Sequence, residues 1–197
     1  MLYVEGPRDR EILETWAKRV EPAIARLIEE RTVILGGRRP ARALEDFRKR
    51  GGEASGWRGL VVLDRDHHDE AEGGDSAPED LAAEPGLELF VWGLRHIESY
   101  LLVPSAIRRL TAGLEGAEQA DALLARELAG DRPLHAKRFL GAGGSLSEAL
   151  GMDLRAGEIA RAMRAEELHA DVRALLSRIG VLSGVSMPQP EVVIRRS

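Results

Sequence analysis

Four acidic residues follow, directly or within a few positions, apolar segments that have the pattern of β-strands. They are Glu5, Asp64, Asp66 and Glu98. Two carboxylates about 4 Å apart repel each other by about 4 kcal/mol at an effective dielectric constant near 20, so a group of ionised acids needs a cation. Carboxylate oxygens select Mg²⁺ or Mn²⁺ over zinc. If the fold brings these acids together, the sequence predicts a site for hard divalent ions.

Hydrophobic periodicity predicts the elements that must bring the acids together. Apolar and β-branched runs indicate four strands, at residues 2–4, 32–35, 57–63 and 87–92. Helical periodicity separates the first three strands, and strands that alternate with helices form a parallel sheet. Ligands of such sheets bind outside the carboxyl ends of the strands, where the acids stand. The predicted fold class is therefore α/β, with a parallel sheet and flanking helices.

The second half of the chain has a helical pattern. Helices are predicted at residues 104–112, 118–128, 134–140, 146–150, 156–163 and 167–179. Between the third and fourth strands, residues 69–85 are acidic, rich in Gly, Ala and Ser, and without periodicity, which is typical of a loop. We expect an α/β core at 1–103, a helical subdomain at 104–184, and a tail or edge strand at 185–197.

The composition excludes several kinds of site and partner. The chain has no cysteine, which excludes disulfides, thiolate metal sites and a cysteine nucleophile. Its net charge of -5 argues against binding nucleic acid by overall charge, although Arg38, Arg39 and Arg42 form a local basic segment. No segment approaches the ~20 apolar residues that cross a bilayer, and the N-terminus has no apolar signal core. We expect a soluble, cytoplasmic protein with no membrane partner.

Three short motifs resemble the TOPRIM fold, which occurs in topoisomerases, primases and several nucleases. Residues 2–9, LYVEGPRD, resemble its glutamate motif, and residues 62–66, VLDRD, resemble its DxD motif. Gly36 and Gly37 stand where the fold has a glycine turn after its second strand. The resemblance implies a TOPRIM-like sheet and a catalytic core within residues 1–103.

Two segments further along the chain resemble one TOPRIM family, the OLD (overcoming lysogenization defect) nucleases. Residues 92–102, WGLRHIESYLL, resemble that family's IENYL segment, with Ser99 in place of asparagine. Residues 135–140, HAKRFL, resemble the part of its helical insert that carries a lysine, here Lys137. Members join an ATPase to a TOPRIM nuclease, and this sequence has no GxxxxGK[ST] loop. The sequence therefore resembles the nuclease half, which implies an ATPase domain as partner in the full-length protein.

The family resemblance implies cleavage of DNA by two Mg²⁺ or Mn²⁺ ions, one activating water and the other stabilising the leaving oxygen. It implies Glu5 and Asp64 as ligands of one ion, and Asp66 and Glu98 as ligands of the other. Asp9 is implied as a further ligand or as a support for one. The family also suggests a role in defence against phage.

Ordinary structural alternatives stand beside these assignments. Lys137 is implied to approach the scissile phosphate and stabilise the transition-state charge, but surface lysines are common in helices. Asp9 could instead stabilise the dipole of the first helix. Glu98 could pair with Arg95, and the two aspartates of the DxD motif could be turn acids.

The histidines and arginines near the predicted site have two interpretations each. His67 and His68 follow the DxD motif, but they begin a polar loop, so solvated side chains are favoured over metal ligands. Arg38, Arg39 and Arg42 could hold a DNA backbone or could keep an exposed helix start soluble.

Three other functions compete with DNA cleavage. An aspartate-nucleophile phosphatase would use Asp64 to attack phosphorus, although the usual Gly-Thr after the second aspartate is absent. A non-catalytic module would bind metal only to order the fold or to regulate an ATPase partner. A primase-like or RNA-maturation activity would keep the TOPRIM fold and change the substrate.

Overall fold

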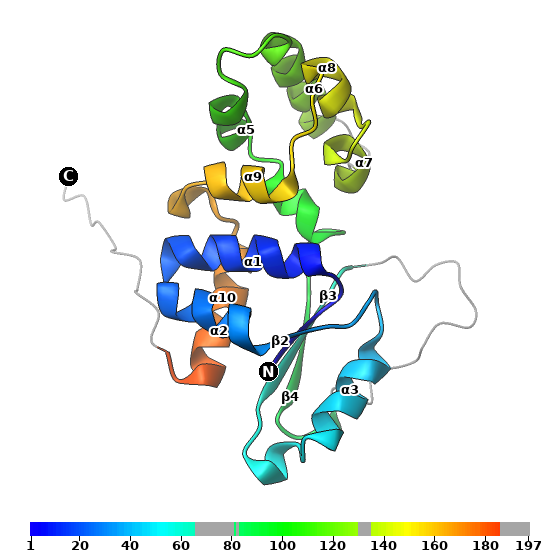
Figure 1. The fold of residues 1–197 in the computed structure, drawn as a ribbon, viewed down its shortest axis with the longest axis vertical. Coiled ribbons are helices and arrows are strands. Elements are labelled where there is room, and N and C mark those ends of the chain that lie inside the picture. Colours follow the sequence, from blue (N-terminus) through cyan, green and yellow to red (C-terminus); the bar gives the residue numbers. More distant parts are fainter. Residues whose placement is uncertain (66–80, 82, 130–134, 186–197) are drawn as a thin grey trace, which may run out of the picture.

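A parallel β-sheet with helices on both faces forms the first part of the chain in the computed structural model (Figure 1). The structure describes residues 1–65, 81, 83–129 and 135–185. The strand order is β2-β1-β3-β4, and neighbouring strands are parallel. The strands are β1 (Leu2–Val4), β2 (Thr32–Ile34), β3 (Gly59–Leu63) and β4 (Leu87–Val91). The predicted α/β class and parallel sheet are confirmed, although the third strand begins two residues later than predicted.

Alternate residues of the central strands supply two apolar cores. The helices involved are α1 (Pro7–Val20), α2 (Pro22–Arg31), α3 (Pro40–Lys49) and α10 (Ala170–Ser183). On β3, Leu60 and Val62 pack in one cluster with apolar residues of α1, α2 and α10. Val61 and Leu63 pack in a second cluster with α3, on the other side of the sheet (Figure 1). Because both faces are covered, the sheet presents only its ends to a ligand.

Proline begins four of the helices. It occupies the first position of α1, α2, α3 and α5 (Pro104–Thr111), where its missing N–H would have no helical partner. Pro22 also separates α1 from α2. The turn carrying Glu5 and Gly6 is therefore followed at once by α1.

The helical part packs against the α/β part. It contains η2 (Ile97–Leu101), α5, α6 (Ala117–Ala129), α7 (Ala136–Leu140), α8 (Ser145–Leu150), α9 (Ala156–Ala162), η3 (Ala165–Glu167) and α10. One further short helix, η1 (Glu53–Ser55), belongs to the α/β part and precedes β3. The indole N–H of Trp16 on α1 donates to the sulfur of Met163, just after α9, at 3.3 Å. One apolar cluster includes residues from the sheet, α1 and the helices α5 to α10. The boundaries at residues 103 and 184 stay predictions.

Some of the sequence predictions lie outside the described residues. They concern Asp66, His67, His68, residues 69–80 of the expected loop, and residues 186–197 of the expected tail. Among the helices that the structure describes, none is long and apolar enough to span a membrane.

Tyr100 ties the last helix to the loop that follows β4. Its hydroxyl donates to Oδ2 of Asp171 on α10 at 2.5 Å and accepts the backbone N–H of Leu94 at 2.8 Å. Its ring packs on Trp92 with centroids 4.8 Å apart. The loop of residues 93–96, between β4 and η2, is thus fastened to α10.

Replacing Tyr100 with Phe should lower the free energy of unfolding by roughly 1–3 kcal/mol, because a carboxylate and a backbone N–H lose their partner together. Urea unfolding followed by circular dichroism measures this loss. Tyr3→Phe is the matched control: Tyr3 donates only to Asp46, which Arg50 also binds. An equal loss of unfolding free energy in both variants would show that the two hydrogen bonds of the Tyr100 hydroxyl stabilise the fold no more than the single bond of Tyr3.

Candidate active site

The carboxyl ends of β1, β3 and β4 meet at one place. The backbone N–H of Asp64, directly after β3, donates to Oε1 of Glu5, directly after β1, at 2.8 Å. Beyond the strands, the Trp92 N–H donates to the Leu63 carbonyl at 3.1 Å and the Arg65 N–H to the Arg95 carbonyl at 2.9 Å. The chain after β4 therefore runs beside the chain after β3 and delivers η2 to the same end of the sheet.

The glycine turn after β2 holds the Glu5 backbone. The N–H groups of Gly36 and Gly37 donate to the Glu5 carbonyl at 3.0 and 2.9 Å. Their φ angles of +78° and +116° lie in a region that favours glycine. The turn predicted from the sequence thus supports an acid of the site.

Two of the basic residues that follow this turn bind backbone carbonyls. Arg38 donates to the Asp64 carbonyl, and Arg42 donates to the Leu35 carbonyl at 2.7 Å. Neither interpretation from the sequence, DNA binding or solubility, included this structural role of the two guanidinium groups. Arg38 links the segment after β2 to the end of β3.

Asp64 lies at the centre of the site. Its side chain is buried, and Oδ1 accepts the backbone N–H of Ile97 at 3.1 Å. Oδ2 lies 3.2 Å from Nδ1 of His96 and 2.9 Å from Nζ of Lys137. An ordinary turn acid has no such set of partners from two distant segments.

Four acids, Glu5, Asp9, Asp64 and Glu98, form the acid cluster of the site. Glu98 is the most buried of them, at 3% exposure. Its Oε1 lies 3.5 Å from the Arg8 guanidinium and its Oε2 lies 3.9 Å from Nζ of Lys137. Oε2 has no hydrogen-bond partner among the described residues. The alternative pairing with Arg95 is wrong, because the Arg95 guanidinium instead contacts Nε2 of His135 at 2.9 Å.

Asp9 both caps α1 and belongs to the acid cluster. Its Oδ2 accepts the Gly6 N–H at 2.7 Å, so the helix-start alternative is part of its role. Burial raises the pKa of its carboxyl to about 7, and the negative charges of Asp64, Glu98 and Glu5 add to this rise, whereas the Gly6 hydrogen bond opposes it. The four acids are therefore close enough for their negative charges to repel one another when all are ionised.

Lys137 supplies the positive charge within this cluster. Burial alone would lower the pKa of its ammonium, but the hydrogen bond to Asp64 and the charges of Glu98, Asp64 and Asp9 leave the pKa raised. The Nζ atom bridges Asp64 and Glu98 from α7, so this lysine is more than a surface residue of a helix. It carries the charge that the acids require.

Two residues of the site were missed by the sequence reasoning. His96 is 8% exposed against Asp64, and Arg8 faces Glu98. His96 stands inside the segment that resembles the IENYL motif, and Arg8 stands inside the glutamate motif. Their position inside these motifs is the signal that could have identified them.

The chemistry of the cluster fits a divalent cation. Its ligands are carboxylate oxygens, one of which is buried without a hydrogen bond, and a lysine ammonium already lies between two of the acids. As these side chains stand, no group of three His, Cys, Asp or Glu residues within the described part of the chain is arranged to hold one ion. In this arrangement the ammonium of Lys137 lies between Asp64 and Glu98.

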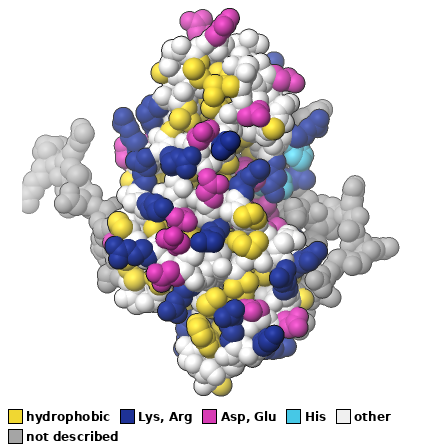
Figure 2. All heavy atoms as spheres, in the orientation of Figure 1, with side chains coloured by type: hydrophobic (Ala, Val, Ile, Leu, Met, Phe, Trp, Pro, Cys, Tyr) yellow, Lys and Arg dark blue, Asp and Glu magenta, His cyan; other side chains and the backbone are white. Residues whose placement is uncertain are grey.

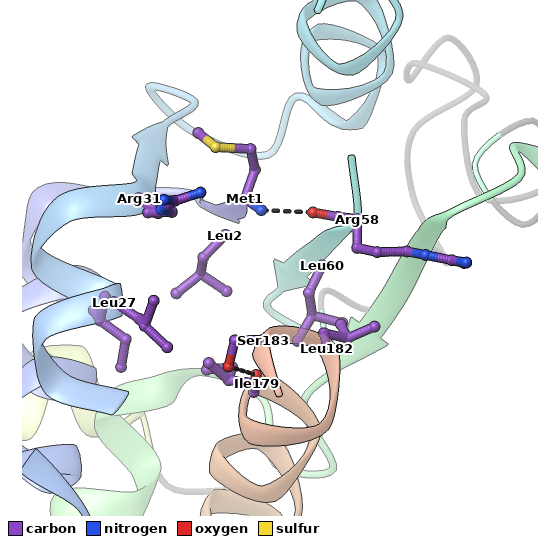
Figure 3. A pocket seen from close by; sticks show the side chains of 10 residues that line it. Met1, Leu2, Leu27, Arg31, Arg58, Leu60, Ile179, Leu182 and Ser183 are labelled. Atoms are coloured by element: carbon purple, nitrogen blue, oxygen red, sulfur yellow. Dashed lines mark hydrogen bonds between the residues drawn. The ribbon is translucent and has the colours of Figure 1, made fainter. Parts of the chain in front are cut away.

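An apolar pocket at the opposite end of the sheet is a poorer candidate. Figure 3 shows it beside the amino ends of β1 and β3, lined by Leu2, Leu27, Leu60, Ile179 and Leu182 among others. Its volume is about 60 Å³, well below the roughly 300–1,000 Å³ of sites that hold small molecules. Its polar side chains are Arg31, Arg58 and Ser183, and the Ser183 hydroxyl donates to the Ile179 carbonyl. This pocket does not gather groups that catalyse a reaction.

Asp9→Asn should stabilise the metal-free protein, increasingly so as the pH rises from about 5 to about 8. With a folded pKa of about 7 against an ordinary 3.8, Asp9 holds a proton in the folded state that the unfolded chain has lost. The stability of the wild type therefore falls as the pH rises through that interval. The asparagine keeps an oxygen for the Gly6 N–H but carries no charge. Urea unfolding in EDTA at both pH values measures the difference, and a gain independent of pH would contradict the raised pKa of Asp9.

The fold has counterparts among solved structures. The C-terminal region of the Burkholderia pseudomallei OLD protein matches with a TM-score of 0.53 and 21% identity, over 90% of this chain and 94% of that chain. The C-terminal region of the Xanthomonas campestris pv. campestris OLD protein matches with a TM-score of 0.52 and 17% identity, over 92% of each chain. No protein-family model and no curated protein matches the sequence. The predicted resemblance is thus confirmed in structure: the chain has the fold of the C-terminal region of OLD proteins.

Proposed function

We propose that this chain is a metal-dependent nuclease that cleaves DNA phosphodiester bonds. The observation that carries the proposal is the ammonium of Lys137, which bridges the buried carboxylates of Asp64 and Glu98 where three parallel strands end. A site that joins several acids to one lysine has the groups needed to bind divalent ions and a phosphate together. The likeness in fold to OLD C-terminal regions supports DNA as the substrate.

The carboxylates would hold two Mg²⁺ or Mn²⁺ ions. Glu5 and Asp64 are proposed for one ion, Glu98 and Asp66 for the other, and Asp9 as a further ligand or support. When bound, the ions would supply an activated water and stabilise the departing oxygen. His96 and the Ile97 N–H orient the Asp64 carboxylate, so its direction is fixed before a metal arrives.

Lys137 would have a second role once metal ions occupy the space between the acids. Its side chain is 46% exposed and reaches the site from α7, so the ammonium can turn from Asp64 toward a phosphate. There it would neutralise the additional negative charge that develops on the phosphate oxygens in the transition state. The same residue thus serves both the empty and the loaded site.

The aspartate-nucleophile alternative is less well supported. A phosphatase of that kind needs one attacking carboxylate and has no use for the buried Glu98 and the partly buried Asp9 beside it. The nuclease uses each of them to bind or support a metal. An ATPase domain in the full-length protein is proposed as a partner, and residues 1–103 are proposed as the catalytic core.

Wild-type protein should nick supercoiled plasmid in Mg²⁺ or Mn²⁺. Asp64→Ala and Glu5→Ala should each reduce the rate by roughly 100-fold or more, because each removes a proposed ligand of the metal ion that would stabilise the transition-state charge. Agarose-gel quantification of nicked plasmid over time measures the rates, with EDTA as the metal-free condition.

Asp121→Ala is the matched control for these variants. Asp121 is a carboxylate of α6 that pairs with exposed Arg108, so its removal should leave the rate unchanged. Equal nicking by the wild type and both site variants would mean that the activity belongs to another site or to a contaminant. No nicking in any divalent ion, with metal binding retained, would instead support a non-catalytic regulatory module.

A further inference from the structure

A cleft opens from the acid cluster into the helical part of the molecule. It shares Glu98 and Lys137 with the site, and its other walls come from the start of α1, the turn after α7 and the start of α9. The residues that line it beyond the cluster are Arg8, Glu11, Leu140, Gly141, Ala142, Asp153, Leu154, Arg155, Ala156 and Gly157. A strand that places a phosphate at Lys137 would meet this cleft next.

The volume of the cleft selects what can enter it. Its volume of about 340 Å³ lies within the range of sites that take small organic ligands, so a single nucleotide can enter it. Two glycines mark places where its walls pack closely: a side chain at Gly141 would meet the Lys137 carbonyl at 2.5 Å, and one at Gly157 would meet Glu11 at 2.1 Å.

Two arginines give the cleft positive charge available for phosphate. Arg8 is 60% exposed and makes only a 3.5 Å contact with Glu98. Arg155 is exposed and makes no ion pair with the described residues. The acids that line the cleft are Glu11, Glu98 and Asp153. Arg161 approaches Glu11 at 3.8 Å, and Arg8 and Lys137 approach Glu98 at 3.5 and 3.9 Å. On the face drawn in Figure 2, Lys and Arg are interspersed with Asp and Glu.

We propose that this cleft binds an unpaired nucleotide adjoining the scissile phosphate, with Arg155 and Arg8 binding its phosphate groups. The proposal rests on the nuclease function and names its substrate class: single-stranded DNA, or a strand end or gap that can separate from its complement. A duplex would have to open to place one strand in the cleft, and the cost of opening would appear as weaker binding.

The test compares binding of fluorescein-labelled single-stranded and duplex oligonucleotides of one sequence, measured by fluorescence anisotropy in Ca²⁺ and in EDTA. Arg155→Ala removes the unpaired charge, and Ala142→Trp fills the cleft from an exposed position. Each should weaken single-strand binding about tenfold, consistent with loss of one charge-assisted contact or of the space itself. Their matched controls are Arg126→Ala and Ala125→Trp, both at exposed positions of α6 that do not line the cleft.

Wild-type protein should bind the single strand more tightly than the duplex, and both control variants should match it. Tighter binding of the duplex, or full single-strand affinity in both cleft variants, would overturn the proposal. Plasmid nicking by the wild type is recorded in parallel. Retained nicking with unaffected single-strand binding refutes only the cleft. Absent nicking in every ion refutes the nuclease itself, while the binding differences still report on the cleft.

Discussion

Repulsion among buried carboxylates is the constraint on which the site depends. Asp64 and Glu98 are almost fully buried. Burial raises the pKa of Asp9 to about 7, and the charges of Asp64, Glu98 and Glu5 add to this rise. Such a group is tolerated only with positive charge inside it, and Lys137 supplies that charge at 2.9 Å from Asp64. We propose that divalent cations can take the place of this ammonium. The helical part is needed because it carries this lysine.

The fold positions the acid cluster mainly by fixing the backbone of the segments that carry the acids. Links between the chain segments after β1, β2, β3 and β4 place the acids, and most of these links are backbone hydrogen bonds. Gly36 and Gly37 hold the Glu5 carbonyl, and Tyr100 fastens the loop before η2 to α10. The acids can therefore repel one another without moving apart, since each is attached to a strand end or a tied loop.

The sheet and part of the site follow from local sequence patterns. Glu5 and Asp64 could be predicted because strand ends in a parallel sheet share an edge, whatever the helices do. Lys137 could not be placed in this way: 73 residues separate it from Asp64, and only the family resemblance pointed to it. His96 was missed because its burial depends on pairing of the chain beyond β3 and β4, which no periodicity encodes. The pairing of Glu98 with Arg95 was wrong because the chain turns Arg95 toward His135.

The claim that Lys137 stands in for a cation is tested most directly by crystals grown without metal and then soaked in Mn²⁺, using anomalous scattering. The account predicts an anomalous peak among Glu5, Asp64 and Glu98 in the soaked crystals, with the Lys137 ammonium moved away from Asp64. Without metal, the ammonium should remain against Asp64. An ammonium that stays against Asp64 at saturating Mn²⁺, with no peak beside these carboxylates, would contradict it.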